Sequence, residues 1–163
     1  MADAKVAPGD PALERAFRTA IKGDVSFDAF TRGLYSTDAS HYQIEPLGVV
    51  FPETTADVQA ILEIARERDV PVLPRGGGTS QCGQTIGRAV ILDTSRHLRQ
   101  ISDLEFRQLG PDRGDNPQHI CVEPGITLDT LNQSLEATGL WFPVDPSTGS
   151  RATLGGMAGN NSA

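Results

Sequence analysis

The sequence predicts an α+β fold made of two α/β subdomains, the second of them incomplete. Three short apolar runs, at residues 47–51, 70–73 and 89–92, are rich in Val, Ile and Leu, as β-strands are. Between the first two runs, apolar residues recur every three to four positions, which is typical of a helix. Strand, helix, strand and strand in succession make a compact βαβ-β unit, about residues 47–93.

The helix of this unit should begin at Thr54 or Thr55, because a hydroxyl at that position accepts a hydrogen bond from the first turn. Its inner face is expected to carry four apolar side chains, Val58, Ile61, Leu62 and Ala65. The pattern therefore predicts one helix that lies against a small sheet.

The first residues predict an N-terminal helical extension over 1–34. Apolar spacing indicates a helix over 11–21 and a short helix near 27–34. Asp24 or Ser26 is expected to cap the second helix. The extension contains no motif that indicates chemistry.

The second subdomain is expected to start near Ile101, where a short strand is indicated. A polar turn over 110–118 and a strand over 119–123 follow. Thr127 should cap a helix with a Leu stripe that ends at Gly139. Residues 154–163 begin a further helical pattern and stop abruptly, so we expect a fragment cut within a domain.

Composition limits the class of protein. A net charge of −7 opposes general binding of nucleic acid, which needs a basic face. No apolar run approaches the roughly 20 residues of a membrane-spanning helix, and the N-terminus lacks the apolar core of a signal peptide. Only two cysteines are present, which is typical of a reducing compartment. We expect a cytoplasmic protein, with peripheral attachment to the inner face of the membrane left open.

The most informative segment is residues 74–84, P-R-G-G-G-T-S-Q-C-G-Q, which follows the second strand. Three successive glycines allow backbone N–H groups to converge without Cβ atoms in the way, which suits a phosphate. Hydrogen-bonding and charged side chains flank them. Taken alone, the run could also be a tight structural turn.

The two commonest phosphate-binding motifs do not match. A mononucleotide P-loop needs a lysine where this chain has Gln84, and no lysine follows Lys22. A dinucleotide motif needs a third glycine at Gln81 and a helix directly after the loop. A different nucleotide-binding fold is therefore indicated.

A second small and polar segment, residues 146–163, reads P-S-T-G-S-R-A-T-L-G-G-M-A-G-N-N-S-A. The two motifs in this order resemble the FAD-binding domain of the vanillyl-alcohol-oxidase or PCMH type. Within it they resemble the FAD-linked oxidases of D-2-hydroxy acids, namely D-lactate dehydrogenase, glycolate oxidase and D-2-hydroxyglutarate dehydrogenase. The Y-S-T-D-A-S-x-Y segment at 35–42 resembles the long members, which carry a C-terminal iron–sulfur region. The resemblance covers residues 35–163.

The resemblance implies which residues hold FAD. The diphosphate would lie on the glycine-rich loop, with Gln84 nearer the flavin: Arg75, Gly76, Gly77, Gly78, Thr79, Ser80 and Gln84. The flavin would be lined by Pro146, Thr153, Gly155, Gly156, Asn160 and Asn161. Relatives that tether FAD do so through a histidine at the place of Thr79, so this chain is expected to bind FAD without a covalent bond.

The resemblance also implies the reaction, which is oxidation of a D-2-hydroxy acid by hydride transfer to flavin N5. Electrons would pass to an iron–sulfur region or a quinone-linked acceptor outside this chain. No catalytic residue is assigned, and the substrate-binding part and the general base are expected elsewhere. The alternatives are an FAD-linked oxidase of an alcohol or sugar, and a non-catalytic nucleotide-binding module.

Other reactive side chains have simpler explanations. Cys82 is expected to be a buried or semi-buried loop residue, and Cys121 and Trp141 are expected in the core. His41, His97 and His119 lack the spacing of metal ligands, so no metal site is expected. Asp38 is expected in a turn or cap.

Overall fold

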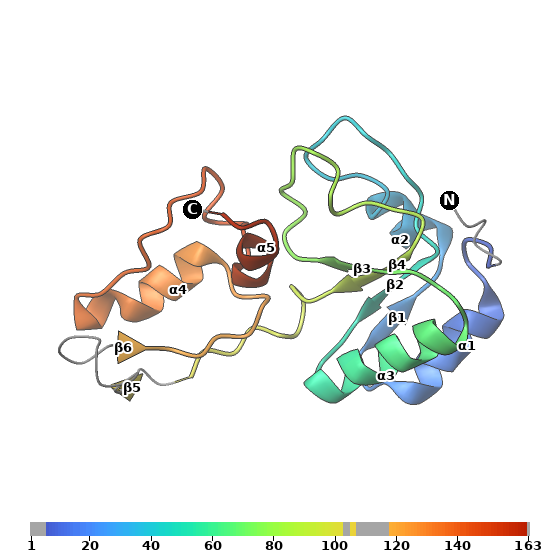
Figure 1. The fold of residues 1–163 in the computed structure, drawn as a ribbon, viewed down its shortest axis with the longest axis horizontal. Helices are drawn as coiled ribbons and strands as arrows, with labels where there is room; N and C mark the ends of the chain where they lie inside the picture. The colour runs from blue at the N-terminus through green and yellow to red at the C-terminus, as the bar shows by residue number, and fades with distance from the viewer. Residues whose placement is uncertain (1–5, 103–104, 107–117, 163) are drawn as a thin grey trace.

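The computed structural model describes residues 6–102, 105–106 and 118–162. Two layered parts follow one another along the chain, and Figure 1 shows them side by side, with α5 between them. The first part contains a four-stranded sheet with helices on it. The second contains a two-stranded ladder and a helix that packs over the extended chain leading to it.

The sheet of the first part has the strand order β1-β2-β4-β3. Its members are β1 (Asp24–Ser26), β2 (Gly48–Phe51), β3 (Val72–Arg75) and β4 (Val90–Asp93). The last three are parallel, and β1 joins β2 as an antiparallel edge. The strand β4 lies between β2 and β3. Because the three strands are parallel, their carboxyl ends meet at one edge of the sheet.

Each helix of the first part begins at a side chain that accepts a backbone N–H. Asp10 caps α1 (Pro11–Ala20), Asp28 caps α2 (Ala29–Leu34), and Thr54 caps α3 (Thr55–Glu67). The Thr54 hydroxyl accepts from the N–H of Asp57 at 3.1 Å. A short polar side chain at this position satisfies a donor that the helix leaves unpaired.

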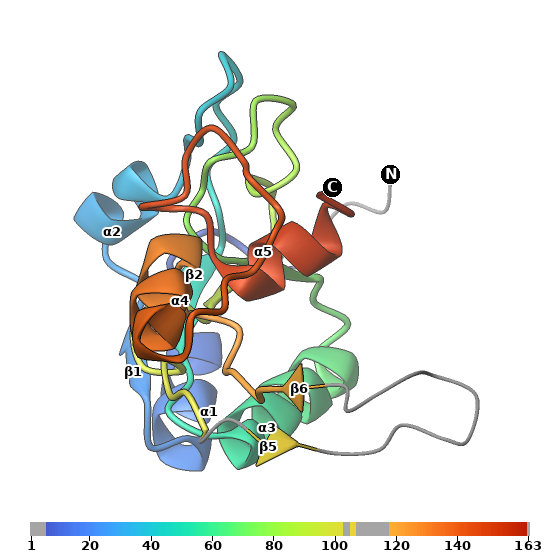
Figure 2. The same cartoon turned by 90° about the vertical axis from the view of Figure 1, so that its left-hand side faces the viewer.

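Alternating residues of the strands face opposite sides of the sheet. On one side, Val50 and Leu92 form the main core with α1 and α3, where Phe17 and Ile61 are fully buried. On the other side, Val49, Phe51 and Ile91 pack against Tyr35 at the end of α2. Figure 2 shows α1 and α3 on the same side of the sheet. The sheet is therefore buried on both faces, as parallel strands usually are.

The second part leaves the sheet along two extended segments that pair with each other. Gly125 N–H donates to Leu98 O at 2.8 Å, and Ile101 forms a bridge with Val122. The remaining elements are β5 (Glu105–Phe106), β6 (Gln118–His119), α4 (Leu128–Leu135), the 3₁₀ turn η1 (Glu136–Thr138) and α5 (Leu154–Gly159). Leu131 and Leu135 of α4 cover the extended segments.

Most expected elements are confirmed, and a few differ in their limits. Strand β3 begins two residues after the expected start at Val70. The strand expected over 119–123 is interrupted, because β6 ends at His119 and Val122 forms a single bridge. The polar turn expected over 110–118 lies outside the described residues, except for Gln118, which begins β6.

The short strand β1 was not expected, and Asp24 and Ser26 lie in it. The cap of α2 is instead Asp28, whose carboxylate accepts from Thr31 N at 2.9 Å. Residues 24–26 form a strand because the open edge of β2 offers backbone partners, which local sequence does not reveal. The N-terminal residues thus share the core of the first part.

Three side chains expected inside lie at the surface. Leu62 is 50% exposed because its neighbour Ile61 faces the sheet, and one helical step turns it away. Cys121 is exposed between Ile120 and Val122, which both pack toward α4. Trp141 is 65% exposed for the same reason, because its two neighbours in the chain point inward and alternation turns it outward. Among the described residues, no helix is both long and apolar enough to cross a bilayer.

Candidate cofactor-binding site

The glycine-rich loop leaves β3 at Arg75, at the edge where the three parallel strands end. Open α/β sheets bind ligands outside the carboxyl ends of their strands. Figure 1 shows the loop between α5 on one side and the segment that follows α2 on the other. Its place in the fold is therefore that of a ligand-binding loop.

The backbone of this loop has an unusual number of free donors. Within the described part of the chain, the N–H groups of residues 76–81 donate no hydrogen bond. The loop is held in other ways: Gly78 O accepts from Ala39 N at 3.2 Å, and Ser80 Oγ accepts from the N–H groups of Cys82 and Gln84. Six successive unpaired donors fit a group with several anionic oxygens, such as a diphosphate.

The segment 35–43 supports the outer side of the loop. Asp38 accepts from the Thr85 hydroxyl at 3.0 Å and from Ser40 N at 2.9 Å, and the second contact closes a local turn. Burial by itself raises the pKa of the Asp38 carboxyl, but these hydrogen bonds outweigh it and hold the pKa below its ordinary value. Gly83 has a φ of +75° and lies against the Tyr42 ring. Asp38 thus has the turn role expected from the sequence.

The second glycine-containing motif, residues 146–163, packs against the glycine-rich loop on the side opposite to segment 35–43. A Cβ at Gly76 would overlap Thr153 Oγ1, and a Cβ at Gly77 would overlap the backbone carbonyl of Arg151. Gln84 Nε2 donates to Asn160 Oδ1 at 3.4 Å. The tertiary structure therefore brings the two motifs into contact, and two of the three glycines are needed for that contact itself.

Thr153 links α5 to this contact. Its side chain is 2% exposed, and its hydroxyl caps α5 by accepting from Gly156 N at 3.2 Å. Its backbone forms a bridge with Thr127, at the start of α4. Gly155 allows a similarly close approach to Pro124. The expected flavin-side residues Thr153, Gly155 and Gly156 thus form one packed unit beside the loop.

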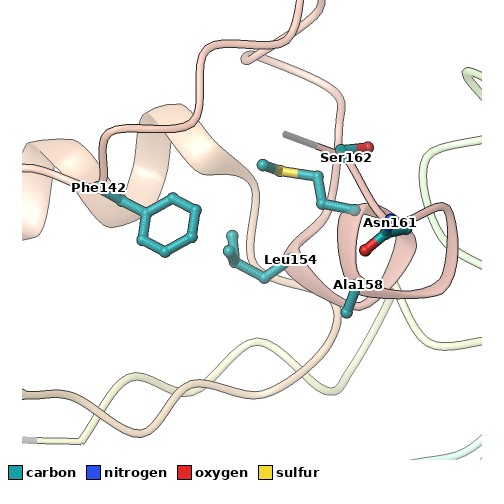
Figure 3. Close-up of a pocket in the computed structure, with 6 residues that line it drawn as sticks. Phe142, Leu154, Ala158, Asn161 and Ser162 are labelled. Atoms are coloured by element: carbon teal, nitrogen blue, oxygen red, sulfur yellow. The ribbon is translucent and has the colours of Figure 1, made fainter.

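A hollow of about 200 Å³ lies beside α5 and is lined by Phe142, Leu154, Met157, Ala158, Asn161 and Ser162. Figure 3 shows Phe142, which comes from the segment after α4, facing Leu154, with Ala158 and Asn161 beyond Leu154. Asn161 adopts a left-handed conformation, with a φ of +51°. Asn161 thus lines the hollow, whereas its neighbour Asn160 contacts Gln84 of the glycine-rich loop. Pro146 precedes the turn at 147–151.

Beneath the loop, half-buried Tyr35 and buried Asp93 form a pair that the sequence did not single out. The Tyr35 hydroxyl donates to Asp93 Oδ2 at 2.6 Å, and Ser95 donates to the other carboxylate oxygen through its N–H and its hydroxyl. Burial and then the Asp93 hydrogen bond raise the pKa of the Tyr35 phenol. The only signal for Tyr35 was its place at the start of the Y-S-T-D motif.

The remaining reactive side chains lie apart from the loop or are exposed. His97 contacts Asp24, the first residue of the edge strand β1, at 2.8 Å, and His41 packs against Tyr42 with ring centroids 4.5 Å apart. Cys82 is exposed, which differs from the expected semi-buried position. Among the described residues, no three His, Cys, Asp or Glu side chains gather in a way that could hold a metal ion.

Comparison with known proteins gives the family of the chain. The family described as "FAD binding domain" matches residues 46–163, and the chain belongs to this family. Its fold is that of the PCMH-type FAD-binding oxidases. Alkyldihydroxyacetonephosphate synthase superimposes with a TM-score of 0.74 at 19% identity, over 95% of this chain and 31% of that protein. Chitooligosaccharide oxidase superimposes with a TM-score of 0.63 at 20% identity, over 90% and 30%.

Relatives found by sequence have a higher identity to this chain than these two structures have. D-2-hydroxyglutarate dehydrogenase of Escherichia coli (strain K12) is 38% identical over 148 residues, which are 89% of this chain and 14% of that protein. Glycolate oxidase subunit GlcD of Bacillus subtilis (strain 168) is 36% identical over 149 residues, 87% of this chain and 29% of that protein. The chain thus spans a small share of the length of these relatives.

Proposed function

We propose that this chain is the FAD-binding portion of a flavin-dependent oxidoreductase that acts on a D-2-hydroxy acid. The observation that carries the proposal is the row of six unpaired N–H groups at residues 76–81, between two motifs that pack together. Backbone donors arranged in this way bind the oxygens of a phosphate group. The family match and the names of the sequence relatives support FAD and a hydroxy-acid substrate.

The diphosphate would lie on the loop, held by the N–H groups of Gly76, Gly77, Gly78, Thr79 and Ser80. Arg75, which the resemblance groups with them, lies at the base of the loop. Gln84 and Asn160, which contact each other, would lie toward the flavin, together with Pro146, Thr153, Gly155, Gly156 and Asn161. Asn161 lines the hollow beside α5, which supports its assignment to the flavin end. An amide both donates and accepts, as the flavin ring edge requires.

FAD, when bound, supplies a two-electron acceptor for the hydrogen on the carbinol carbon of the substrate. The chain itself would bind and orient the cofactor. Electron transfer to an iron–sulfur region or a quinone-linked acceptor belongs to the proposal, as does a cytoplasmic location. The limits 1–34 for the extension and 35–163 for the FAD domain also remain proposals. The extension nevertheless shares a core with the sheet, because Leu13 and Phe17 pack there.

The test uses the full-length protein. It should purify yellow, and its flavin absorption should bleach without oxygen on addition of D-2-hydroxyglutarate, D-lactate or glycolate. The L-enantiomers of the chiral acids serve as matched controls and should not bleach it. Acid precipitation should release the flavin, because Thr79 offers no covalent tether.

Other results would reject specific parts of the proposal. Bleaching by an alcohol or sugar and by none of the acids would contradict the substrate class. Failure to bind FAD on reconstitution would reject the cofactor and favour a non-catalytic module. Flavin that stays with the precipitated polypeptide would contradict non-covalent binding.

A further inference from the structure

The guanidinium of Arg75 lies under the loop that Arg75 itself begins. One of its nitrogens faces the backbone carbonyls of Thr85, at 3.3 Å, and of Tyr35, at 3.5 Å. Its carbon lies over the Tyr35 ring, 5.0 Å from the ring centre. A Cβ at Gly78 would meet the guanidinium. The loop is thus folded over the side chain of its first residue.

All of these contacts are with uncharged groups. In the part of the chain that the structure describes, Arg75 forms no ion pair, although it is partly buried. The Thr85 carbonyl is at the far end of the loop, so one nitrogen connects the two ends of residues 75–85. The Tyr35 ring is itself held by Phe51, with centroids 5.8 Å apart, and by the hydroxyl bond to Asp93.

We propose that Arg75 is a positioning residue: it clasps the base of the glycine-rich loop through Tyr35 and Thr85, so that the N–H groups of 76–81 converge, and it does not bind the diphosphate directly. The inference rests on the proposed function only for the identity of the ligand, FAD. The contacts of Arg75 with Tyr35 and Thr85 lie within the chain and do not depend on that ligand. Tyr35 thereby becomes part of the cofactor site without touching the cofactor.

Lysine at position 75 distinguishes a clasp from a phosphate contact. Arg75→Lys keeps the positive charge but loses the planar guanidinium that stacks on the ring while it reaches two carbonyls. A contact of one nitrogen with a phosphate would tolerate this change, because lysine also binds phosphate as a point charge. A clasp would not tolerate it.

The experiment measures the dissociation constant of FAD for the full-length protein and its variants. Arg75→Lys should weaken binding about tenfold, the effect of losing one hydrogen bond to a charged group. Tyr35→Leu should weaken it similarly, whereas Tyr35→Phe keeps the ring and should stay within about twofold. The double variant Arg75→Lys with Tyr35→Leu should be little weaker than either single variant, because both remove one clasp. Arg88→Lys, at an exposed position after the loop, is the matched control.

A second measurement needs no cofactor. In the FAD-free protein, exchange of the Ala39, Cys82 and Gln84 amides, which donate hydrogen bonds to the loop, should be about tenfold faster in Arg75→Lys than in Arg88→Lys, while exchange in α3 stays unchanged. Normal FAD affinity in Arg75→Lys, or independent effects of Arg75→Lys and Tyr35→Leu, would overturn the clasp. Absence of FAD binding in every variant would reject the proposed function, and the exchange result would still decide the role of Arg75.

Discussion

Substitution of Gly77 tests whether the contact between the two motifs builds the cofactor site. A Cβ at Gly77 would overlap the carbonyl oxygen of Arg151, which is a backbone atom and cannot rotate away. The φ of Gly77 is not in the left-handed region, so alanine is acceptable to the local backbone. Gly77→Ala therefore changes the packing between the motifs and little else.

The expected magnitude follows from this overlap. Forcing one extra carbon into a close contact costs about 1–3 kcal/mol. The strain is relieved when the loop and the 151–153 segment move apart, which separates the two groups of proposed FAD contacts. If that strain is released only in the FAD-free protein, binding weakens by about fivefold to hundredfold, because 1.4 kcal/mol is a factor of ten.

The assay is titration of the FAD-free full-length protein with FAD, followed by flavin fluorescence. Gly33→Ala is the matched control, because nothing lies within 4 Å of its Cβ position, on the exposed helix α2. Amide exchange at Leu154, whose N–H donates to Ile126 O, and in the rest of α5 should rise in Gly77→Ala and stay unchanged in the control. FAD affinity within twofold of the parent protein in Gly77→Ala would refute the reasoning.

Three further changes test the supports of the site, each read by native-state amide exchange in the full-length protein. Asp57→Asn should lower local stability around β1 and α3 by about 2–4 kcal/mol, because the carboxylate accepts from Lys22, Gly23 and Glu53 N–H groups. Thr153→Val should loosen α5 by about 1 kcal/mol through loss of the cap, and Thr153→Ser should not. Ile61→Ala should cost about 2–5 kcal/mol at a fully buried position, whereas Leu62→Ala, half exposed, should cost under about 1 kcal/mol.

The Asp57 effect should depend on pH. Burial raises the pKa of this carboxyl, but its backbone hydrogen bonds outweigh burial and hold the pKa below its ordinary value. A lowered folded-state pKa gives stability that is complete above the unfolded pKa, near 4, and is lost as pH falls through the folded value. The difference between the parent protein and Asp57→Asn should therefore shrink below about pH 4. A constant difference down to pH 2 would show that ionisation is irrelevant.

Sequence patterns predicted the caps of α3 and α4, but not that of α2, because residues 24–26 join the edge of β2 instead. The helix caps Thr54 and Thr127 could be predicted because a hydroxyl satisfies donors only two or three residues away. Leu62, Cys121 and Trp141 could not be placed correctly, because exposure depends on which neighbour lies across the interface. Strand β1 was missed because its only reason to form is the free edge of β2.

The sequence by itself determined the three parallel strands, the glycine-rich loop after β3 and the second motif, and the two motifs together indicated the FAD-binding family. These features follow from side-chain period, backbone freedom and residue chemistry along the chain. Only the tertiary structure decided that Gly76 and Gly77 are needed for contact with residues 151–153, and that Arg75 lies beneath its own loop against Tyr35. The reason is that both depend on atoms 40 or more residues away in the chain, which only the tertiary packing brings together.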